Sequence, residues 1–154
     1  MKVYWQDITE LELERVMEPI LKIDNLKVSF MTSNGEVQAV RGVSFSVEKG
    51  EILGIVGESG SGKSVTSMSI LHLLADTARI KEGSSIRFDE EELIGAPGKR
   101  MREIRGEKIS MIFQDPMSSL NPLIPVGKQV AEMLREHHPD ISKEEAKKAV
   151  LELF

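Results

Sequence analysis

A chain of 154 residues, 40% of them apolar and 29% charged, has the composition of a soluble globular protein that can bury one core. The net charge of −5 leaves no basic excess to neutralise a phosphate backbone, which argues against nucleic acid as a partner. The lack of cysteine excludes disulfides and thiolate metal sites, and no apolar run reaches the roughly 20 residues that a membrane-spanning helix needs. Together with the absence of a signal-peptide core, these features favour a cytoplasmic location.

The chain opens with an acidic segment, residues 1–18, in which carboxylates outnumber basic side chains. Ile8, Leu11 and Val16 would form a weak apolar stripe on a helix, so the segment is either a short docking helix or a frayed extension. Because Pro19 interrupts helical structure, we expect a boundary here between an N-terminal extension, 1–18, and a folded domain, 19–154.

An antiparallel β region is predicted next. Two alternating apolar patterns flank a turn at residues 33–36 and comprise Leu26, Val28 and Phe30, then Val43, Phe45 and Val47. A second turn at residues 48–50 leads directly into Ile52–Val56. This continuous apolar run predicts a strand that is buried on both faces of a parallel sheet.

The most informative stretch follows that strand: Gly57-Glu58-Ser59-Gly60-Ser61-Gly62-Lys63-Ser64. After it, residues 64–75 are predicted to form a helix whose apolar stripe comprises Val65, Met68, Leu71 and Leu74, widened by Ile70 and Leu73. Glycines allow the backbone to wrap closely around a triphosphate, and the start of a helix offers free N–H groups and the positive end of its dipole. Lys63 would place a positive charge on the outer phosphates, and the Ser64 hydroxyl is a ligand for Mg²⁺. Strand, loop and helix together predict a nucleotide site.

Further along, the pattern predicts a returning strand at residues 85–89, a short basic helix at 99–105 and a buried strand at 109–113 that ends at Gln114. An amphipathic helix is expected at residues 126–137, with Val130, Met133 and Leu134 facing inward. A last helix begins after Ser142, which forms a capping box with Glu145, and its apolar stripe comprises Ala146, Val150 and Leu153. No glycine or proline ends this helix before Phe154, as at an interior position of a longer protein.

This order of elements resembles the ATP-binding subunits of ABC transporters. Within that family, the importer branch for oligopeptides, dipeptides and nickel is the most similar, on the stretch Met111-Ile112-Phe113-Gln114-Asp115-Pro116-Met117-Ser118-Ser119-Leu120-Asn121-Pro122. The phosphate loop fits the same branch, and the resemblance runs from about Glu18 to Phe154. It implies an α/β P-loop NTPase core, a mostly parallel sheet with helices, carrying an antiparallel β subdomain and the start of a helical subdomain.

The resemblance also implies what the residues bind. ATP and Mg²⁺ would be held by the loop from Gly57 to Val65, with Ser64 and Gln114 at the metal. Gln114 would also position the attacking water, and a polar residue at the end of a buried parallel strand does lie where such sheets bind ligands. Phe30 occupies the place of a ring that stacks on adenine, but it fits equally well as a core residue of an alternating strand.

By the same resemblance, the chain would work with transmembrane permease subunits and with a second ATP-binding subunit, as a homo- or heterodimer. It would lie on the inner face of the cell membrane and couple ATP binding and hydrolysis to uptake of peptides, nickel or related solutes.

Several of the family's motifs are absent from these 154 residues: the Leu-Ser-Gly-Gly-Gln-type signature, an apolar strand ending in Asp-Glu, and the later switch histidine. Asp89-Glu90 imitates the Asp-Glu element, but Arg87 interrupts its apolar run and it precedes Gln114. His72 is expected to pack or to lie at the surface, and His137 and His138 to lie near a helix C-terminus.

We therefore expect this chain to bind Mg·ATP without turning it over, because the general base and the motif that closes on a partner's ATP are not present. Two hypotheses remain: the ATP-holding half of a peptide-importer ATPase, or a non-hydrolysing remnant of a decayed gene. A kinase or GTPase would need a base or lid sequence of its own, and none is evident.

Overall fold

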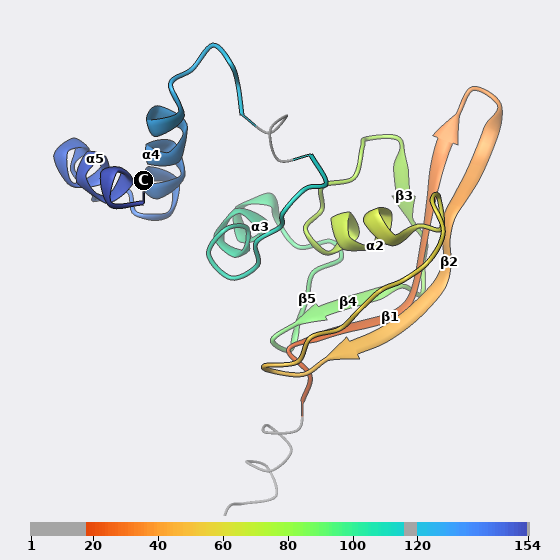
Figure 1. Ribbon diagram of the computed structural model, residues 1–154. Helices are drawn as coiled ribbons and strands as arrows, with labels where there is room; N and C mark the ends of the chain where they lie inside the picture. The colour runs from red at the N-terminus through yellow and green to blue at the C-terminus, as the bar shows by residue number, and fades with distance from the viewer. Residues whose placement is uncertain (1–17, 116–119, 154) are drawn as a thin grey trace, which may run out of the picture. The chain divides into compact units, whose positions relative to one another are not determined.

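The computed structural model describes residues 18–115 and 120–153, which fall into two compact units, Met1–Ala96 and Pro97–Phe154 (Figure 1). The acidic segment that was predicted to be either a docking helix or an extension lies outside the described residues, as does part of the loop after Asp115.

The first unit is built on an antiparallel sheet. β1 (Leu21–Thr32) and β2 (Gly35–Val47) form a long hairpin that turns at residues 33–34. The other edge of β1 pairs with two short strands, β4 (Ser85–Phe88) beside its start and β3 (Ala78–Ile80) beside its end, and β5 (Glu91–Glu92) pairs with β4 (Figure 1). The five-stranded sheet confirms the predicted antiparallel region and the returning strand.

The core of this unit depends on an irregularity in β1. Ile23 and Leu26 are three residues apart and would point to opposite faces of a regular strand, yet both are buried. Asn25 lies between them in the left-handed region at φ 47°, and the register with β2 shifts at this point. This bulge brings both side chains into the core with Val28 and Ile86.

α2 (Lys63–Ile70) packs on β2 and is shorter than the predicted helix, because His72 adopts a left-handed conformation at φ 50° and ends it. The predicted apolar stripe is also partly wrong. Leu71 is buried, but Leu73 is exposed, and the helix itself buries Thr66 and Ser69. Their hydroxyls donate to the carbonyls of Gly62 and Val65, four residues earlier, and so are satisfied within the helix.

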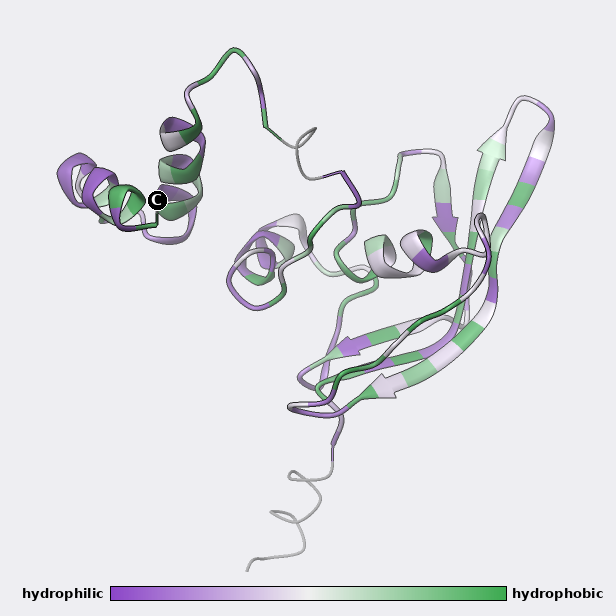
Figure 2. Cartoon of the chain, in the orientation of Figure 1, coloured by the Kyte–Doolittle hydropathy of each residue, from purple (hydrophilic) through white to green (hydrophobic). Residues whose placement is uncertain are grey.

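The predicted buried strand Ile52–Val56 is not formed. The segment is extended chain without a strand partner among the described residues, and Ile52 and Val56 are 96% and 94% exposed. Figure 2 shows it as a run of green residues that follows β2 outside the sheet. A strand of this kind needs neighbours on both edges as well as covered faces, and these described residues provide neither.

The described residues of the second unit form three helices: α3 (Gly98–Ile104), α4 (Val126–His137) and α5 (Lys143–Glu152). Their predicted positions are confirmed, and so is the capping box: Ser142 N–H donates to Glu145 Oε2 at 3.0 Å, and Glu145 N–H donates to Ser142 Oγ at 3.2 Å. α4 and α5 pack against each other, with Ala146 and Val150 buried.

Two predictions for the second unit are wrong. Met133 and Leu153 were expected to face inward, but both are exposed, because the contact between two short helices covers only one narrow stripe of each. The buried strand at 109–113 is also absent: Ile109 forms a single parallel bridge with Arg105, and Ile112 is 90% exposed. The reason is the one that applies to Ile52–Val56, the lack of neighbouring strands among the described residues.

Candidate nucleotide-binding site

The loop between residue 56 and α2 has the backbone that its glycines predict. Gly60 and Gly62 adopt positive φ angles of 79° and 92°, and the Ser61 N–H donates to Glu58 O at 3.2 Å to close a tight turn. A Cβ on Gly62 would lie 2.6 Å from the carbonyl oxygen of Ala39 on β2. A Cβ on Gly57 would lie 2.7 Å from Ser61 Oγ. Gly62 therefore requires glycine for both space and conformation, whereas rotation of the Ser61 hydroxyl would relieve the contact at Gly57.

The ammonium group of Lys63 forms hydrogen bonds to the loop that precedes it. Its Nζ donates to the carbonyl oxygens of Gly57 at 2.7 Å and Glu58 at 2.8 Å, and to Ser61 Oγ at 3.3 Å. The ammonium thus lies on the inner side of the turn, with the chain curled around it. Carbonyl oxygens and phosphate oxygens are both acceptors, so a phosphate chain would bind this ammonium by replacing the carbonyls of Gly57 and Glu58.

The first turn of α2 adds further donors. Thr66 N–H is the first amide of the helix to reach a carbonyl, Gly62 O at 2.9 Å, so the amides of Lys63, Ser64 and Val65 precede the intrahelical hydrogen bonds. No acidic side chain lies in this turn, and Ser64 is exposed at its second position. These groups fit an anion at the helix N-terminus, with the Ser64 hydroxyl free to take a metal ligand position.

The two other predicted site residues occupy different surroundings. Phe30 is half-buried on β1, opposite Val37 on β2 and Ala78 on β3. Val37 is two residues from Ala39, the residue on which Gly62 packs, so the ring lies on the part of the hairpin that supports the phosphate loop. Gln114 belongs to the second unit and is exposed in irregular chain, because the strand expected to end at it is not formed.

Asp89-Glu90, the imitation of an Asp-Glu element, is a hairpin turn. Both residues adopt positive φ angles, 49° and 67°, between β4 and β5, as a two-residue turn between antiparallel strands requires. His137 is the last residue of α4 and packs against the backbone of Gly106, and His138 follows as the C-cap. In residues 18–115 and 120–153, no group of three or more His, Asp and Glu side chains is arranged to hold a metal ion.

The sequence did not predict a group of hydrogen bonds that the Gln129 side chain makes at the start of α4. The Gln129 side-chain amide donates to Asn121 O and Ile124 O, at 3.0 and 2.8 Å, and its Oε1 accepts from Asn121 N–H at 2.9 Å. These three hydrogen bonds fix the turn that leads into the helix. A glutamine in the first turn of an amphipathic helix carries no sequence signal that would have revealed them.

The antiparallel sheet, the glycine loop and the helix after it are typical of the P-loop NTPase α/β class. Among solved structures, the dimeric structure of MJ0796, a bacterial ABC transporter cassette, matches with a TM-score of 0.72 at 26% identity. The match covers 86% of this chain and 54% of that one, and it confirms the predicted fold class.

The family follows from the sequence comparisons. The family model described as ABC transporter matches residues 40–153, and the chain belongs to this family. It is 51% identical to the oligopeptide transport ATP-binding protein OppD of Bacillus subtilis, over 88% of this chain and 37% of that protein. It is 53% identical to the dipeptide transport ATP-binding protein DppD of the same organism, over 90% of this chain and 41% of that protein. The chain thus spans about two fifths of the length of these relatives. These matches confirm the predicted resemblance to the peptide-importer branch.

No helix among the described residues is both long and apolar enough to cross a membrane.

Proposed function

We propose that the chain is the ATP-holding part of an ABC importer subunit, one that couples ATP binding and hydrolysis to uptake of peptides across the cell membrane. The relatives that share half of its residues are named peptide transport ATP-binding proteins. The observation that carries the proposal is the loop from Gly57 to Lys63, where the glycines leave space for backbone donors and the lysine is already enclosed.

In this proposal the phosphates lie along the loop, from Gly57 to Gly62, and against the exposed amides of Lys63, Ser64 and Val65. The loop residues Glu58, Ser59, Gly60 and Ser61 contribute through their backbone. Lys63 transfers its hydrogen bonds from the carbonyls of Gly57 and Glu58 to phosphate oxygens, which are stronger, charged acceptors. A bound Mg²⁺ would neutralise phosphate charge, and Ser64 and Gln114 are the residues proposed to hold it.

Phe30 is the residue proposed to contact adenine. Its ring is half-buried rather than enclosed, so part of its face is accessible, and it lies on the hairpin that also supports Gly62. Stacking on a purine would use that exposed face, and such contacts contribute about 0.5–1.5 kcal/mol beyond burial.

The partners proposed for the longer protein are transmembrane permease subunits and a second ATP-binding subunit, with the assembly on the inner face of the membrane. Co-purification of the permease with a tagged ATP-binding subunit from membranes tests this, and recovery of the subunit without any permease would contradict it.

Titration of the 154-residue chain with a fluorescent ATP analogue tests the site. Lys63→Ala is expected to weaken binding about ten- to a hundredfold, because a charge-assisted hydrogen bond contributes about 1.5–3 kcal/mol. Lys49→Ala, an exposed lysine in the turn after β2, is the matched control and should leave affinity unchanged. Phe30→Ala should weaken ATP more than inorganic triphosphate. Equal affinities of wild type and Lys63→Ala would remove the phosphate-loop assignment.

Binding is expected to proceed without turnover in this 154-residue chain, since it contains no carboxylate base in the family's position, and general-base catalysis is typically worth about 10²–10⁴ in rate. Phosphate release should equal the background without enzyme. Release above background that disappears in Lys63→Ala would show that a base is present.

A further inference from the structure

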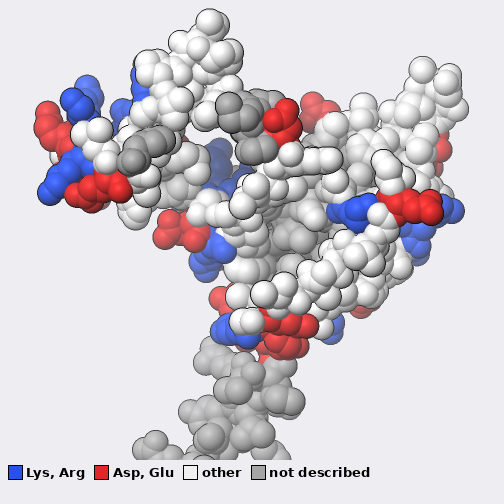
Figure 3. All heavy atoms as spheres, viewed as in Figure 1, with Lys and Arg blue, Asp and Glu red and all other residues white. Residues whose placement is uncertain are grey.

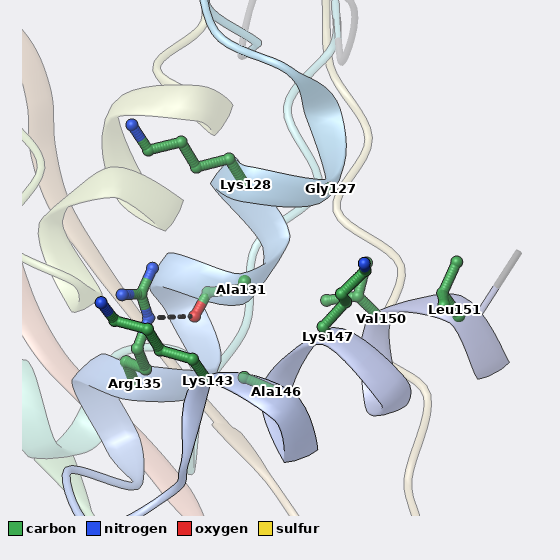
Figure 4. A pocket seen from close by; sticks show the side chains of 9 residues that line it. All are labelled: Gly127, Lys128, Ala131, Arg135, Lys143, Ala146, Lys147, Val150 and Leu151. Atoms are coloured by element: carbon green, nitrogen blue, oxygen red, sulfur yellow. Dashed lines mark hydrogen bonds between the residues drawn. The ribbon is translucent and has the colours of Figure 1, made fainter.

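The second unit contains a groove between α4 and α5 that the nucleotide site does not use. It has a volume of about 390 Å³ and runs between the two helices from Gly127 to Arg135 on α4 and from Lys143 to Leu151 on α5 (Figure 4). Because the helices are antiparallel, Gly127 lies near Val150 at one end, and Arg135 and Lys143 lie together at the other. About two helical turns of each helix therefore line the groove.

Every charged side chain that lines this groove is positive: Lys128, Arg135, Lys143 and Lys147. On the face that Figure 3 shows, the region of α4 and α5 carries side chains of both signs. Within the described residues none of these four cations forms an ion pair, and the Arg135 Nε–H donates only to the carbonyl of Ala131 at 3.2 Å. Their charges are therefore not neutralised within the helical pair.

Two of these cations stand where helix electrostatics disfavours them. Lys143 is the first residue of α5 and Lys128 is in the first turn of α4, so both lie at the positive end of a helix dipole. The stability of the two helices therefore does not explain why lysines occur at these two positions. The positive potential extends along the groove instead of being confined to one end.

The floor of the groove is apolar and is formed mainly by residues with small side chains. Ala131 and Ala146 contribute only methyl groups, Gly127 contributes none, and Val150 and Leu151 form the wall at one end. Leu151 is 67% exposed, so this wall is not covered by the rest of the described unit. Small residues between two helices leave room for the side chains of a third helix.

We propose that this groove binds an acidic amphipathic helix of a partner polypeptide. Its apolar stripe would lie on the floor formed by Ala131, Ala146 and Val150, and its carboxylates would pair with the four cations along the rims. Charge complementarity selects this occupant: a basic or neutral helix would leave the cations unpaired or repelled. The groove and the phosphate loop belong to different units and share no residue, so the test of this proposal does not depend on the proposed function.

The probe is a fluorescein-labelled synthetic helix of about three turns with a leucine stripe flanked by glutamates, titrated with the full 154-residue chain by fluorescence anisotropy. The double variant Lys143→Gln, Lys147→Gln is expected to bind the probe at least about tenfold more weakly than wild type. Lys148→Gln is the matched control, because Lys148 is exposed on the same helix but does not line the groove, and it should change affinity less than about twofold. Ala131→Leu, which fills the floor without removing a charge, should also abolish binding.

A version of the probe with lysines in place of the glutamates should bind at least about tenfold more weakly than the acidic one. Circular dichroism and thermal unfolding of each variant establish that the helical pair is retained. Equal binding of the acidic and basic probes, or equal loss in Lys148→Gln, would overturn the proposal. So would phosphatidylglycerol vesicles whose binding depends on Lys143 and Lys147 while binding of the acidic probe does not, since the groove would then be a lipid-binding surface.

Discussion

Two stretches of the first unit, β1 and residues 52–56, both have sequences that predict a strand, but only β1 forms one. Leu26 and Val28 on β1 are completely buried, whereas Ile52 and Val56 are almost completely exposed. β1 pairs along its length with β2 on one edge and with β3 and β4 on the other, and residues 52–56 pair with nothing described. The difference shows that an apolar run becomes a strand only where its backbone finds lateral partners.

The phosphate loop joins the unpaired segment, residues 52–56, to α2 and the sheet. Its end at Gly62 rests on the backbone of β2 and continues into α2. Its beginning at Gly57 follows the unpaired segment and is held by Lys63, which donates to the carbonyls of Gly57 and Glu58. One end of the site is therefore fixed by the sheet and the other by a single side chain.

The largest expected effect separates the two stretches directly. Leu26→Ala should lower the free energy of unfolding by about 2–5 kcal/mol, because it leaves a cavity in a packed core. Ile52→Ala removes an equally apolar side chain that is 96% exposed and should change stability by less than about 0.5 kcal/mol. Urea denaturation of both variants measures the difference. A loss of similar size in Ile52→Ala would mean that residues 52–56 are buried in solution.

A smaller effect is expected within the loop, where two glycines share a left-handed conformation but not their surroundings. Gly60→Ala and Gly62→Ala both force a non-glycine residue to a positive φ, which costs about 1–2 kcal/mol. Only Gly62→Ala also brings a methyl group against the carbonyl of Ala39, since nothing lies within 4 Å of a Cβ on Gly60. Gly62→Ala should therefore lower the melting temperature more than Gly60→Ala.

The same pair should differ in ATP affinity, because movement of Gly62 away from β2 would displace the helix N-terminus that is proposed to bind phosphate. Isothermal titration of both variants with ATP checks this. Equal losses in the two variants would show that contact with β2 does not position the loop.

The sequence was sufficient where the deciding forces are local. The capping box of Ser142, the limits of α4, the hairpin of β1 and β2 and the glycine turn all follow from residues close together in the chain. It was insufficient at 52–56 and 109–113, where the pattern indicates a strand but the outcome depends on partners far away in sequence. The early end of α2 depends on the backbone conformation of His72, and the turn before α4 depends on the side-chain hydrogen bonds of Gln129. No periodic pattern in the sequence encodes either feature.

The smallest effect concerns a carboxylate that belongs to the sheet. Burial tends to raise the pKa of Glu92, but hydrogen bonds from the Ser85 hydroxyl and from the amides of Ile86 and Ile94 outweigh it, and the pKa is lowered from its ordinary value of 4.5. A lowered folded-state pKa means that the ionised carboxylate stabilises the fold above the unfolded-state pKa. This contribution is lost as the pH falls through the lower, folded-state value.

Glu92→Gln should therefore lower the free energy of unfolding by about 1 kcal/mol at pH 7, a value reduced by the exposure of the side chain. The gap from wild type should narrow as the pH falls below the ordinary pKa of 4.5. Glu51→Gln is the control from the unpaired region. Glu51 accepts a single N–H, from Glu48 at 2.7 Å, in a turn that carries no further sheet structure, so its replacement should change stability less. Denaturant unfolding of both variants between pH 3 and pH 7 measures these differences. If Glu51→Gln destabilised the chain as much as Glu92→Gln, the turn before residues 52–56 would have to be as firmly part of the folded structure as the hairpin of β4 and β5.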